Sequence, residues 1–442
     1  MSTLIELLQA AAIPLTGSAQ DYDALMRRVG DARLVLLGEA SHGTHEFYRE
    51  RAQITKRLIQ EKGFTTIAVE ADWPDACRIN RFVRGSRGDA DAVDALEDFE
   101  RFPQWMWRNA DVLDFVGWLR EHNDAQPTED SKTGFYGLDL YSLHASIDAV
   151  ISYLMKEDVA AAERARVHYA CFDRFDRDVQ TYGLASAMGV TASCEAAVIQ
   201  ALTELRVKKS EYLRGEGRGA VDEFFCAEQN SIVIKNAEQY YRTMFRGEVS
   251  SWNLRDRHMM DTLLSLIRYL EQYQHPAKVV VWAHNSHLGN ASATEMGERG
   301  EFNLGQLVRQ RFGPEAVAIG FTTHSGTVTA ASDWDAPAER KYVRPAVSDS
   351  YEDLFHHVGH ARFWLDLALH PGLAMELRNA RLERAIGVIY RPETELVSHY
   401  FRARLPDQFD GVLHFDKTRA VEPLERTVRK GIEVEETFPS GL

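Results

Sequence analysis

Carboxylate and imidazole side chains directly follow four short apolar runs of this sequence. In chain order they are Glu39 and His42, Glu70 and Asp72, Asp139, and His284 and His287. Ligands of open α/β sheets bind at the carboxyl ends of the strands, so we expect these side chains to meet in one cleft. Each of them alone is most simply explained as a helix cap or a turn residue. Together, carboxylates and histidines shift each other's pKa values, and the set predicts an acid–base site.

His42 is the candidate general base of this site. It lies in a turn between Gly38 and Gly43, where glycine lets the backbone turn tightly. A neutral imidazole can take a proton from water near pH 7, and a neighbouring carboxylate stabilises the imidazolium that forms. Glu39 and Glu70 both qualify as that carboxylate. Such a pair serves ester hydrolysis without a metal ion.

Ester hydrolysis also needs hydrogen-bond donors for the reacting carbonyl group. The carbonyl oxygen becomes negatively charged in the tetrahedral transition state, and preorganised donors stabilise that charge. The sequence offers His284, His287 and Arg51 for this role and does not decide among them.

Aromatic residues gather in the tract 101–109, which has a loop-like sequence. Its rings can wall an apolar ligand pocket, although core packing is the more frequent use of such rings. His45 is a further candidate because it shares a helix entrance with His42. The predicted substrate-binding residues are therefore His45, Asp72, Trp105, Trp107, Arg108 and Asp139.

Two other polar segments are interpreted as structural. The segment Trp252–Met259 is expected to join two helices, with Asn253 as an N-cap. His356, His357 and His360 lie at helical spacing, which permits metal binding, but without a clear acidic partner we interpret them as a mostly solvated face. We expect neither a metal ion nor a cofactor. No GxSxG motif and no Gly-rich phosphate loop with a following Lys is present, so serine hydrolases and kinases lose support.

Composition narrows the class of protein further. The 442 residues carry a formal net charge of −15, which offers no basic patch for a nucleic-acid partner. The N-terminal 15 residues lack the basic residue of a secretory signal, and no later stretch reaches the roughly 18 apolar residues of a membrane span. Cys77, Cys171, Cys194 and Cys226 have no CxxC spacing and are expected to be free thiols. These features predict a cytoplasmic protein.

Short apolar runs at the two ends of the chain indicate an α/β fold with buried parallel strands. A helical pattern at 46–61, closed by Gly63, joins the first two runs in a right-handed βαβ unit. From about 142 to 274 no strand is indicated, and apolar residues recur at helical spacing, which predicts an insertion of four or five helices. The predicted strands are 33–37, 65–69, 134–138, 278–283, 316–321 and 386–390.

Several motifs of the sequence resemble those of the erythromycin esterase family. The likeness spans roughly Leu34 to Tyr400 and is specific for the superfamily. It is carried by Gly38–Gly43, Val69–Trp73, Trp107-Arg108, Ala227–Asn230, Trp252–Asp256 and Trp282–His287. The resemblance implies a three-layer α/β/α core with a mainly parallel sheet, formed by residues 1–141 and 275–442, and a helical insertion at 142–274 that covers the cleft.

The resemblance also implies an activity, the metal-independent hydrolysis of a macrolide lactone by an activated water. Carried over to matching positions, it makes His42 the general base, Glu39 and Glu70 the acidic residues and Arg51 the motif arginine. The second histidine falls on His284, with His287 close by. We expect a small-molecule ester or lactone as substrate; the sequence does not define its identity or the oligomeric state.

Two alternatives remain open at this point. The same Glu and His residues can ligate a divalent metal, which would make a metal-bound hydroxide the nucleophile. The chain can also be a binding protein that captures a small molecule in the cleft without converting it.

Overall fold

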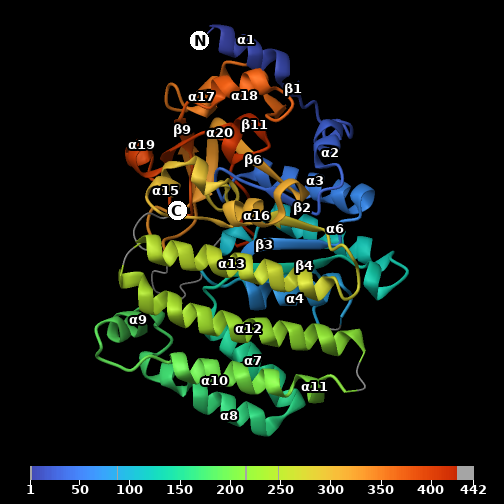
Figure 1. Cartoon of the computed structure of the whole chain (residues 1–442), viewed down its shortest axis with the longest axis vertical. Coiled ribbons are helices and arrows are strands. Elements are labelled where there is room, and N and C mark those ends of the chain that lie inside the picture. Colours follow the sequence, from blue (N-terminus) through green and yellow to red (C-terminus); the bar gives the residue numbers. More distant parts are fainter. Residues whose placement is uncertain (1, 87, 215–216, 247, 426–442) are drawn as a thin grey trace.

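The computed structural model describes residues 2–86, 88–214, 217–246 and 248–425, and a mixed, mostly parallel sheet lies at its centre (Figure 1). Its strands are β1 (Ile13–Pro14), β2 (Leu34–Leu37), β3 (Thr66–Asp72), β4 (Gly134–Asp139), β5 (Val279–Trp282), β6 (Ala316–Ala330), β7 (Glu339–Val343), β8 (Arg362–Asp366) and β11 (Gly411–Thr418). They lie in the order β1-β8-β11-β6-β2-β5-β3-β4, with β7 paired to β6. The run from β11 to β4 is parallel, and β8 runs antiparallel to β11. Outside this sheet, β9 (Arg381–Arg384) pairs with β10 (Tyr400–Ala403).

Helices cover both faces of the sheet because its strands are apolar on both sides. Val35 and Leu37 of β2 pack in one core with helices of one face, whereas Leu34 and Leu36 pack in a second core with helices of the other. The first face carries α2 (Asp23–Val29), α3 (His45–Lys62) and α6 (Ala110–Asp124). The second carries α1 (Ser2–Ala11), α13 (Glu248–Leu270), α16 (Leu304–Phe312), α17 (Tyr351–His356) and α18 (Pro371–Leu377). The three-layer α/β/α core is thereby confirmed.

The first βαβ unit sets up the site. Strand β2 leads through residues 38–44 into α3, which ends at Lys62 and is followed by Gly63 in a left-handed conformation with a φ of 69°. The chain then returns as β3 and passes directly into α4 (Trp73–Val83). Shorter helices lie in the remaining loops: α5 (Ala92–Ala95), α14 (Asn285–Leu288), α15 (Glu295–Glu298), α19 (Glu395–Ser398) and α20 (Leu405–Gln408).

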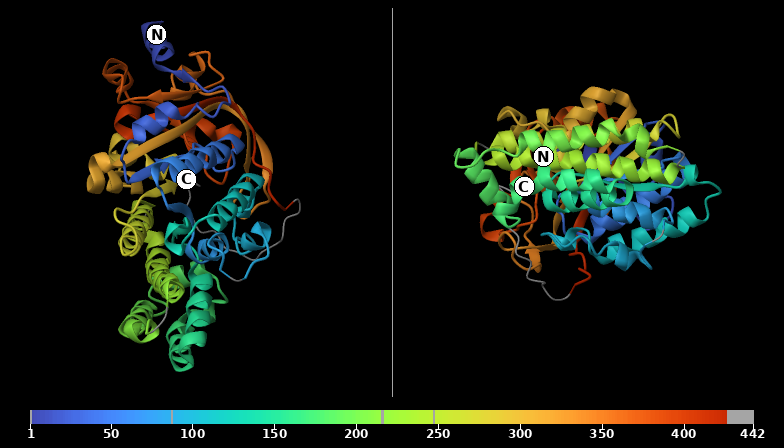
Figure 2. Two further views of the ribbon diagram at one scale, coloured as in Figure 1. Left: turned by 90° about the vertical axis from the view of Figure 1, so that its right-hand side faces the viewer. Right: turned by 90° about the horizontal axis from the view of Figure 1, so that it is seen from below.

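The described residues of 142–274 are mainly helical, and they form more helices than the four or five that we expected. They are α7 (Leu143–Glu157), α8 (Val159–Tyr169), α9 (Val179–Ala187), α10 (Glu195–Val207), α11 (Lys209–Tyr212), α12 (Arg218–Thr243) and α13. Helices α7 to α12 share a core of their own and form one end of the molecule, beyond α4 and β4 (Figures 1 and 2). Within the described ranges, no helix is both long enough and apolar enough to cross a bilayer.

Five of the six predicted strands are confirmed as β2 to β6. The prediction for 386–390 is wrong, because Ile386 and Ile389 make only isolated bridges, to Ser41 and Ala331. Strands β8 and β11 were not predicted from the sequence. Strand β11 carries His414 and Asp416, so it lacks the continuous apolar run that marks a buried parallel strand.

The prediction of free thiols is wrong as well. Cys77 of α4 is paired with Cys226 of α12, and Cys171 with Cys194. The partners are 149 and 23 residues apart in sequence, so the spacing motifs that we searched for do not reveal them. The cysteines therefore give no argument for a reducing compartment.

Candidate active site

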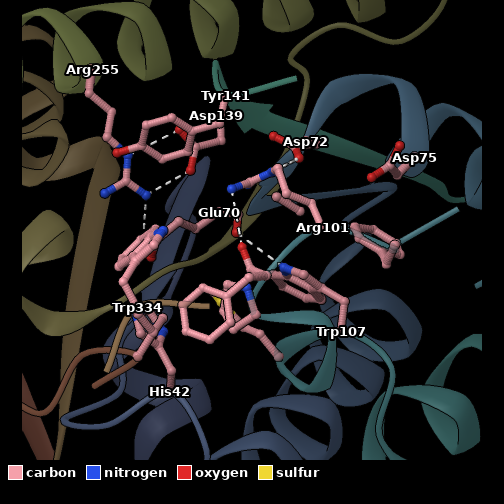
Figure 3. Close-up of a pocket in the computed structure, with 16 residues that line it drawn as sticks. His42, Glu70, Asp72, Asp75, Arg101, Trp107, Asp139, Tyr141, Arg255 and Trp334 are labelled. Atoms are coloured by element: carbon pink, nitrogen blue, oxygen red, sulfur yellow. Dashed lines mark hydrogen bonds and ion pairs between the residues drawn. The ribbon is translucent and has the colours of Figure 1, made fainter. Parts of the chain in front are cut away.

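A pocket lies at the carboxyl ends of β2, β3 and β4 (Figure 3). His42 follows β2, Glu70 and Asp72 belong to the end of β3, and Asp139 ends β4; all four line the pocket. The structure thus brings together four of the residues that the sequence placed at strand ends. Aromatic rings form much of the remaining wall: Phe99, Phe102, Trp107, Tyr141 and Trp334.

A bulge in β3 presents consecutive residues to this pocket. The pairing of β3 with β4 shifts register between Val69 and Asp72. A regular strand points successive side chains to opposite faces, whereas a bulge re-aims them. Glu70, Ala71 and Asp72 consequently all line the pocket.

His42 is held by a carboxylate that is itself held by an arginine. The imidazole Nδ1 lies 3.0 Å from Glu39 Oε1, and Arg51 Nη2 donates to Glu39 Oε2 at 2.8 Å. An ionised carboxylate only accepts hydrogen bonds, so Nδ1 carries the proton and Nε2 keeps its lone pair. Arg51 is buried against the rings of Tyr48 and Trp282, at 4.5 and 5.1 Å. It therefore orients Glu39 from behind the pocket.

His284 lies beside His42 but, like His287, is not among the described residues that line the pocket. Ser286 N–H donates to His284 Nδ1 at 3.2 Å, so the proton of the neutral ring sits on Nε2. That Nε2 is buried and makes no hydrogen bond of standard geometry with the described part of the chain, although the backbone of Ala40 acts on the ring. The rings of His284 and His42 lie 4.9 Å apart. Burial, and then the proximity of His42, hold the pKa of His284 well below its usual range, so the ring is neutral near pH 7.

Arg255 of α13 joins the ends of β3 and β4. Its Nε and Nη2 donate to the two oxygens of Asp139 at 3.0 and 2.6 Å, and Nη2 also donates to Glu70 Oε1 at 2.7 Å. Glu70 Oε2 accepts the backbone N–H of His284 at 2.8 Å. Glu70 thus fixes the chain at the end of β5 while its charge faces the pocket.

The charges around Glu70 keep it ionised. Burial alone raises the pKa of this carboxyl, but His287, Arg255 and His42 beside it and the backbone N–H of His284 outweigh burial. The pKa of Glu70 consequently lies below its usual range. Asp139 is similar: burial raises its pKa, the Arg255 guanidinium outweighs burial, and the net shift is downward.

His287 stands behind Glu70. Its Nδ1 lies 2.9 Å from Asp256 Oδ2, and its Nε2 lies 2.9 Å from Arg255 Nη1. The ring of Trp252 stacks on the imidazole with 4.5 Å between centroids. His287 is 1% exposed and is not among the described residues that line the pocket. It therefore connects α13 to the site and does not face a ligand.

Three residues predicted to bind substrate, His45, Trp105 and Arg108, are not among the described residues that line the pocket. His45 contacts Asp111 and Arg419, at 2.8 and 2.7 Å. Trp105 is buried, and Arg108 Nη1 donates to the backbone of Leu96 at 2.7 Å. By contrast Asp72, Trp107 and Asp139 line the pocket, and their binding of substrate stays a prediction.

Arg255, Asp256 and Arg101 were not predicted as site residues. The segment Trp252–Met259 was interpreted as a helix junction with Asn253 as a cap, but α13 runs without interruption from Glu248 to Leu270. The available signal was the adjacent Arg–Asp pair within an otherwise amphipathic stretch. This Arg–Asp pair can be recognised as part of the site only once it is known that α13 packs at the ends of β3 and β4.

Gly38 and Gly43 are required for close packing and not for a tight turn. Neither has a left-handed backbone. A Cβ at Gly38 would collide with the side chain of Asn285, and one at Gly43 with the backbone of Thr329. The missing side chains of Gly38 and Gly43 therefore allow residues 38–43 to lie close to Asn285 and Thr329.

Across the described ranges, no group of three or more His, Cys, Asp or Glu side chains is arranged to hold a metal ion. His356 and His357, considered above as metal ligands, are 44% and 59% exposed at their side chains and contact Asp416 and Asp353.

The sequence profile of a family described as erythromycin esterase matches residues 59–418. Erythromycin esterase type II of Escherichia coli is 22% identical over 320 residues, 70% of this chain and 73% of that protein. A crystal structure of a Bacillus cereus protein superposes with a TM-score of 0.78 at 23% identity, covering 96% of this chain and 99% of that one. An erythromycin esterase mutant in its open conformation gives a TM-score of 0.64 at 16% identity, covering 95% and 97%.

The structural likenesses establish the shared fold. The matched range begins within α3, so Glu39, His42 and Arg51 lie before it, and the account of these residues rests on their geometry. The matched residues make up well over half of this chain. The chain therefore belongs to the erythromycin esterase family of hydrolases.

Proposed function

We propose that this hydrolase cleaves a carboxylic ester or lactone with a water activated by His42. The supporting observation is the buried series Arg51–Glu39–His42, which leaves His42 Nε2 without a hydrogen-bond partner among the described residues, beside a pocket. General-base catalysis requires such a nitrogen within reach of a water and a substrate.

The reaction begins when His42 Nε2 takes a proton from water as the oxygen attacks the carbonyl carbon. Glu39 stabilises the imidazolium that forms, and the ionised Glu70 adds a second negative charge nearby. The tetrahedral intermediate then breaks its bond to the alkoxide oxygen, which receives the proton back from His42. The products are the acid and the alcohol, or a hydroxy acid if the substrate is a lactone.

His284 is the proposed donor to the oxyanion. Its neutral ring carries a proton on Nε2, and this buried atom makes no hydrogen bond of standard geometry with the described residues. A donor that is preorganised in a dry site stabilises developing charge strongly. Of the other candidates, Arg51 donates from Nη2 to Glu39, and His287 contacts Asp256 and Arg255 through its two ring nitrogens. We therefore assign them to orienting roles.

The test is a hydrolysis screen with a broad set of esters and lactones, macrolides included. Replacing His42 by Ala is expected to lower kcat by about 100-fold or more on any substrate found, with the fold intact by circular dichroism. His168→Ala is the matched control, because His168 lies on α8 and contacts Glu204 at 3.1 Å. Near wild-type turnover by His42→Ala would remove His42 from the role of base.

A further inference from the structure

Glu383 is a buried carboxyl group that lies outside the pocket and that the proposed mechanism does not use. It belongs to β9 and is 0% exposed. Within the described ranges, no Lys or Arg side chain forms an ion pair with it. Arg384 contacts Glu395 at 2.9 Å, and Arg381 contacts Asp349 at 3.6 Å. A buried carboxylate without a cation is too costly to persist, so this group requires a proton.

The hydrogen bonding around Glu383 lacks a donor. Two buried carboxyl oxygens, Glu383 Oε2 and Glu352 Oε2, make no hydrogen bond of standard geometry with the described residues, and neither does the buried amide oxygen of Gln408. Glu352 and Gln408 are both close enough to act on the Glu383 carboxyl. A buried acceptor without a donor costs free energy. A proton on Glu383 Oε2 supplies the missing donor to this group.

The charges around Glu383 favour the neutral acid as well. Burial raises the pKa of Glu383 well above its usual range, and the Glu352 carboxyl raises it further. The amides of Gln408 and Asn285 act in the opposite direction and do not reverse the shift. Burial also raises the pKa of Glu352, although the Arg384 guanidinium opposes it. Glu383 is therefore protonated near pH 7.

Asn285 links this acid to the active site. Its Nδ2 donates to the backbone oxygen of Phe321 at 2.8 Å and, at the longer distance of 3.5 Å, to Glu383 Oε1. Its backbone N–H donates to the backbone oxygen of Glu39 at 2.8 Å, and it directly follows His284 in the chain. Glu383 thus stands behind the residue that connects the ends of β2 and β5 to β6.

The segment that carries Glu383 also supports the turn of His42. The backbone N–H of Ile386, three residues further on, donates to the backbone oxygen of Ala40 at 2.8 Å. Ile386 also forms a bridge with Ser41. Residues 40 and 41 lie between Glu39 and His42. The same short segment therefore contacts the chain on both sides of the proposed chemistry.

We propose that Glu383 is a positioning residue, held as a neutral carboxylic acid, that orients Asn285 and thereby the Glu39–His42 turn and His284. The inference rests on the proposed hydrolase function, because it gives Glu383 a part in aligning the base and the oxyanion donor of that reaction. In the neutral acid, Oε1 accepts from the Asn285 amide and Oε2 donates to a neighbouring acceptor.

Infrared spectroscopy tests the neutral acid without any substrate. The spectrum of the wild type minus that of Glu383→Gln at pH 7 is expected to show the carbonyl stretch of a protonated carboxyl group, which shifts in heavy water. Absence of this band would overturn the proposal. Gln has the shape and charge of the neutral acid, so a Glu383→Gln protein that fails to fold would contradict it too.

Steady-state kinetics test the positioning. Glu383→Gln keeps the acceptor for Asn285 and should retain kcat within about twofold, whereas Glu383→Met removes it and should lower kcat about tenfold with KM unchanged, because small displacements of catalytic groups are costly. Glu383→Asp withdraws the acid by one methylene and should act like Glu383→Met, so it replaces that variant if Glu383→Met does not fold.

Glu163→Met is the matched control, since Glu163 lies on α8 with a side chain that is 61% exposed. Its kcat should equal that of the wild type. Wild-type kcat in Glu383→Met, or equal losses in Glu383→Met and Glu383→Gln, would overturn the role of Glu383.

Hydrogen exchange separates this proposal from the proposed function. If no ester is cleaved, or if His42→Ala keeps its turnover, the proposed function fails, but the backbone amide of Asn285 can still be followed. Its exchange should be faster in Glu383→Met than in the wild type and unchanged in Glu383→Gln. Equal exchange in all three proteins would overturn the link from Glu383 to the site.

Discussion

Glu39 and Glu70 have different partners, although the sequence offered both as the carboxylate of His42. Glu39 Oε1 contacts His42 Nδ1 directly, whereas Glu70 holds the backbone of His284 and the guanidinium of Arg255. Glu39 therefore fixes the orientation of the His42 ring. Glu70 supplies a buried negative charge and connects three strand ends.

Replacing Glu70 by Gln is expected to lower kcat about tenfold or more and to move the acidic limb of the pH–rate profile to lower pH. The pKa of Glu70 is lowered, so the group is ionised throughout the working range, and its removal weakens proton binding by the neighbouring base. The measurement is kcat/KM as a function of pH.

The control for this variant is Glu204→Gln. Burial raises the pKa of Glu204, but His168 and Arg164 outweigh burial and lower it, and this carboxylate lies on α10 outside the pocket. An unchanged acidic limb and an unchanged kcat in Glu70→Gln would show that Glu70 does not act on the base.

The hydrolysis is predicted to be independent of metal ions. His42, His284 and His287 each have a protein partner that orients the ring, so their chemistry has a source of charge stabilisation within the chain. Activity is expected to survive prolonged dialysis against EDTA. Loss of activity that zinc or manganese restores would instead support a metal-bound hydroxide as the nucleophile.

Outside the sheet, the loop 99–107 supplies several residues that line the pocket, and α13 supplies Arg255. Arg255 of α13 reaches the ends of β3 and β4, and Phe99, Phe102 and Trp107 supply ring surface from the loop. Both segments enter the pocket without belonging to the sheet. They are the elements by which relatives with the same core can differ in substrate.

We predict that the helical segment 142–274 closes over a bound substrate and affects its selection. Hydrogen exchange with and without an inert substrate analogue should show added protection in α13 around Arg255, since a closed cleft excludes water from that helix.

The loop 99–107 provides the comparison in the same experiment. Protection that rises at His42 and His284 but nowhere in 142–274 would contradict the lid. The loop that carries Phe102 and Trp107 would then be the element that determines specificity.

Several histidines are buried in the folded protein, and burial keeps them neutral. Burial lowers the pKa of His258 to about 4 and also lowers the pKa values of His284 and His414. In the unfolded chain each histidine has a pKa of about 6.5. Below that pH the unfolded state binds more protons than the folded state, so acid favours unfolding.

The free energy of unfolding is therefore expected to be fully retained above about pH 6.5 and to fall as the pH decreases toward about 4. Each additional proton taken up on unfolding contributes about 1.4 kcal/mol per pH unit. The melting temperature measured across this range tests the trend. His258→Asn should flatten it, whereas His275→Asn should not, because the His275 side chain is 75% exposed. Stability independent of pH over this range would contradict the expectation.

Local sequence patterns determined the framework of this protein. The apolar runs of β2 to β6 are too long for solvated loops, so these strands can be predicted from the sequence. Hydrophobic periodicity also predicts the helix between β2 and β3. The polar residues at the strand ends can then be located directly. Strand topology then requires that Glu70, Asp139 and His42 share one edge, because parallel strands align their carboxyl ends.

Only the tertiary structure decided how the site works. The bulge in β3, the contacts of Arg255 with Glu70 and Asp139, and the pairing of Cys77 with Cys226 join residues that are distant in sequence. Their energies depend on packing between elements, and no local propensity encodes it. For the same reason His45 and Arg108, adjacent in sequence to site residues, point to other partners, whereas Arg255 on a distant helix reaches the centre of the site.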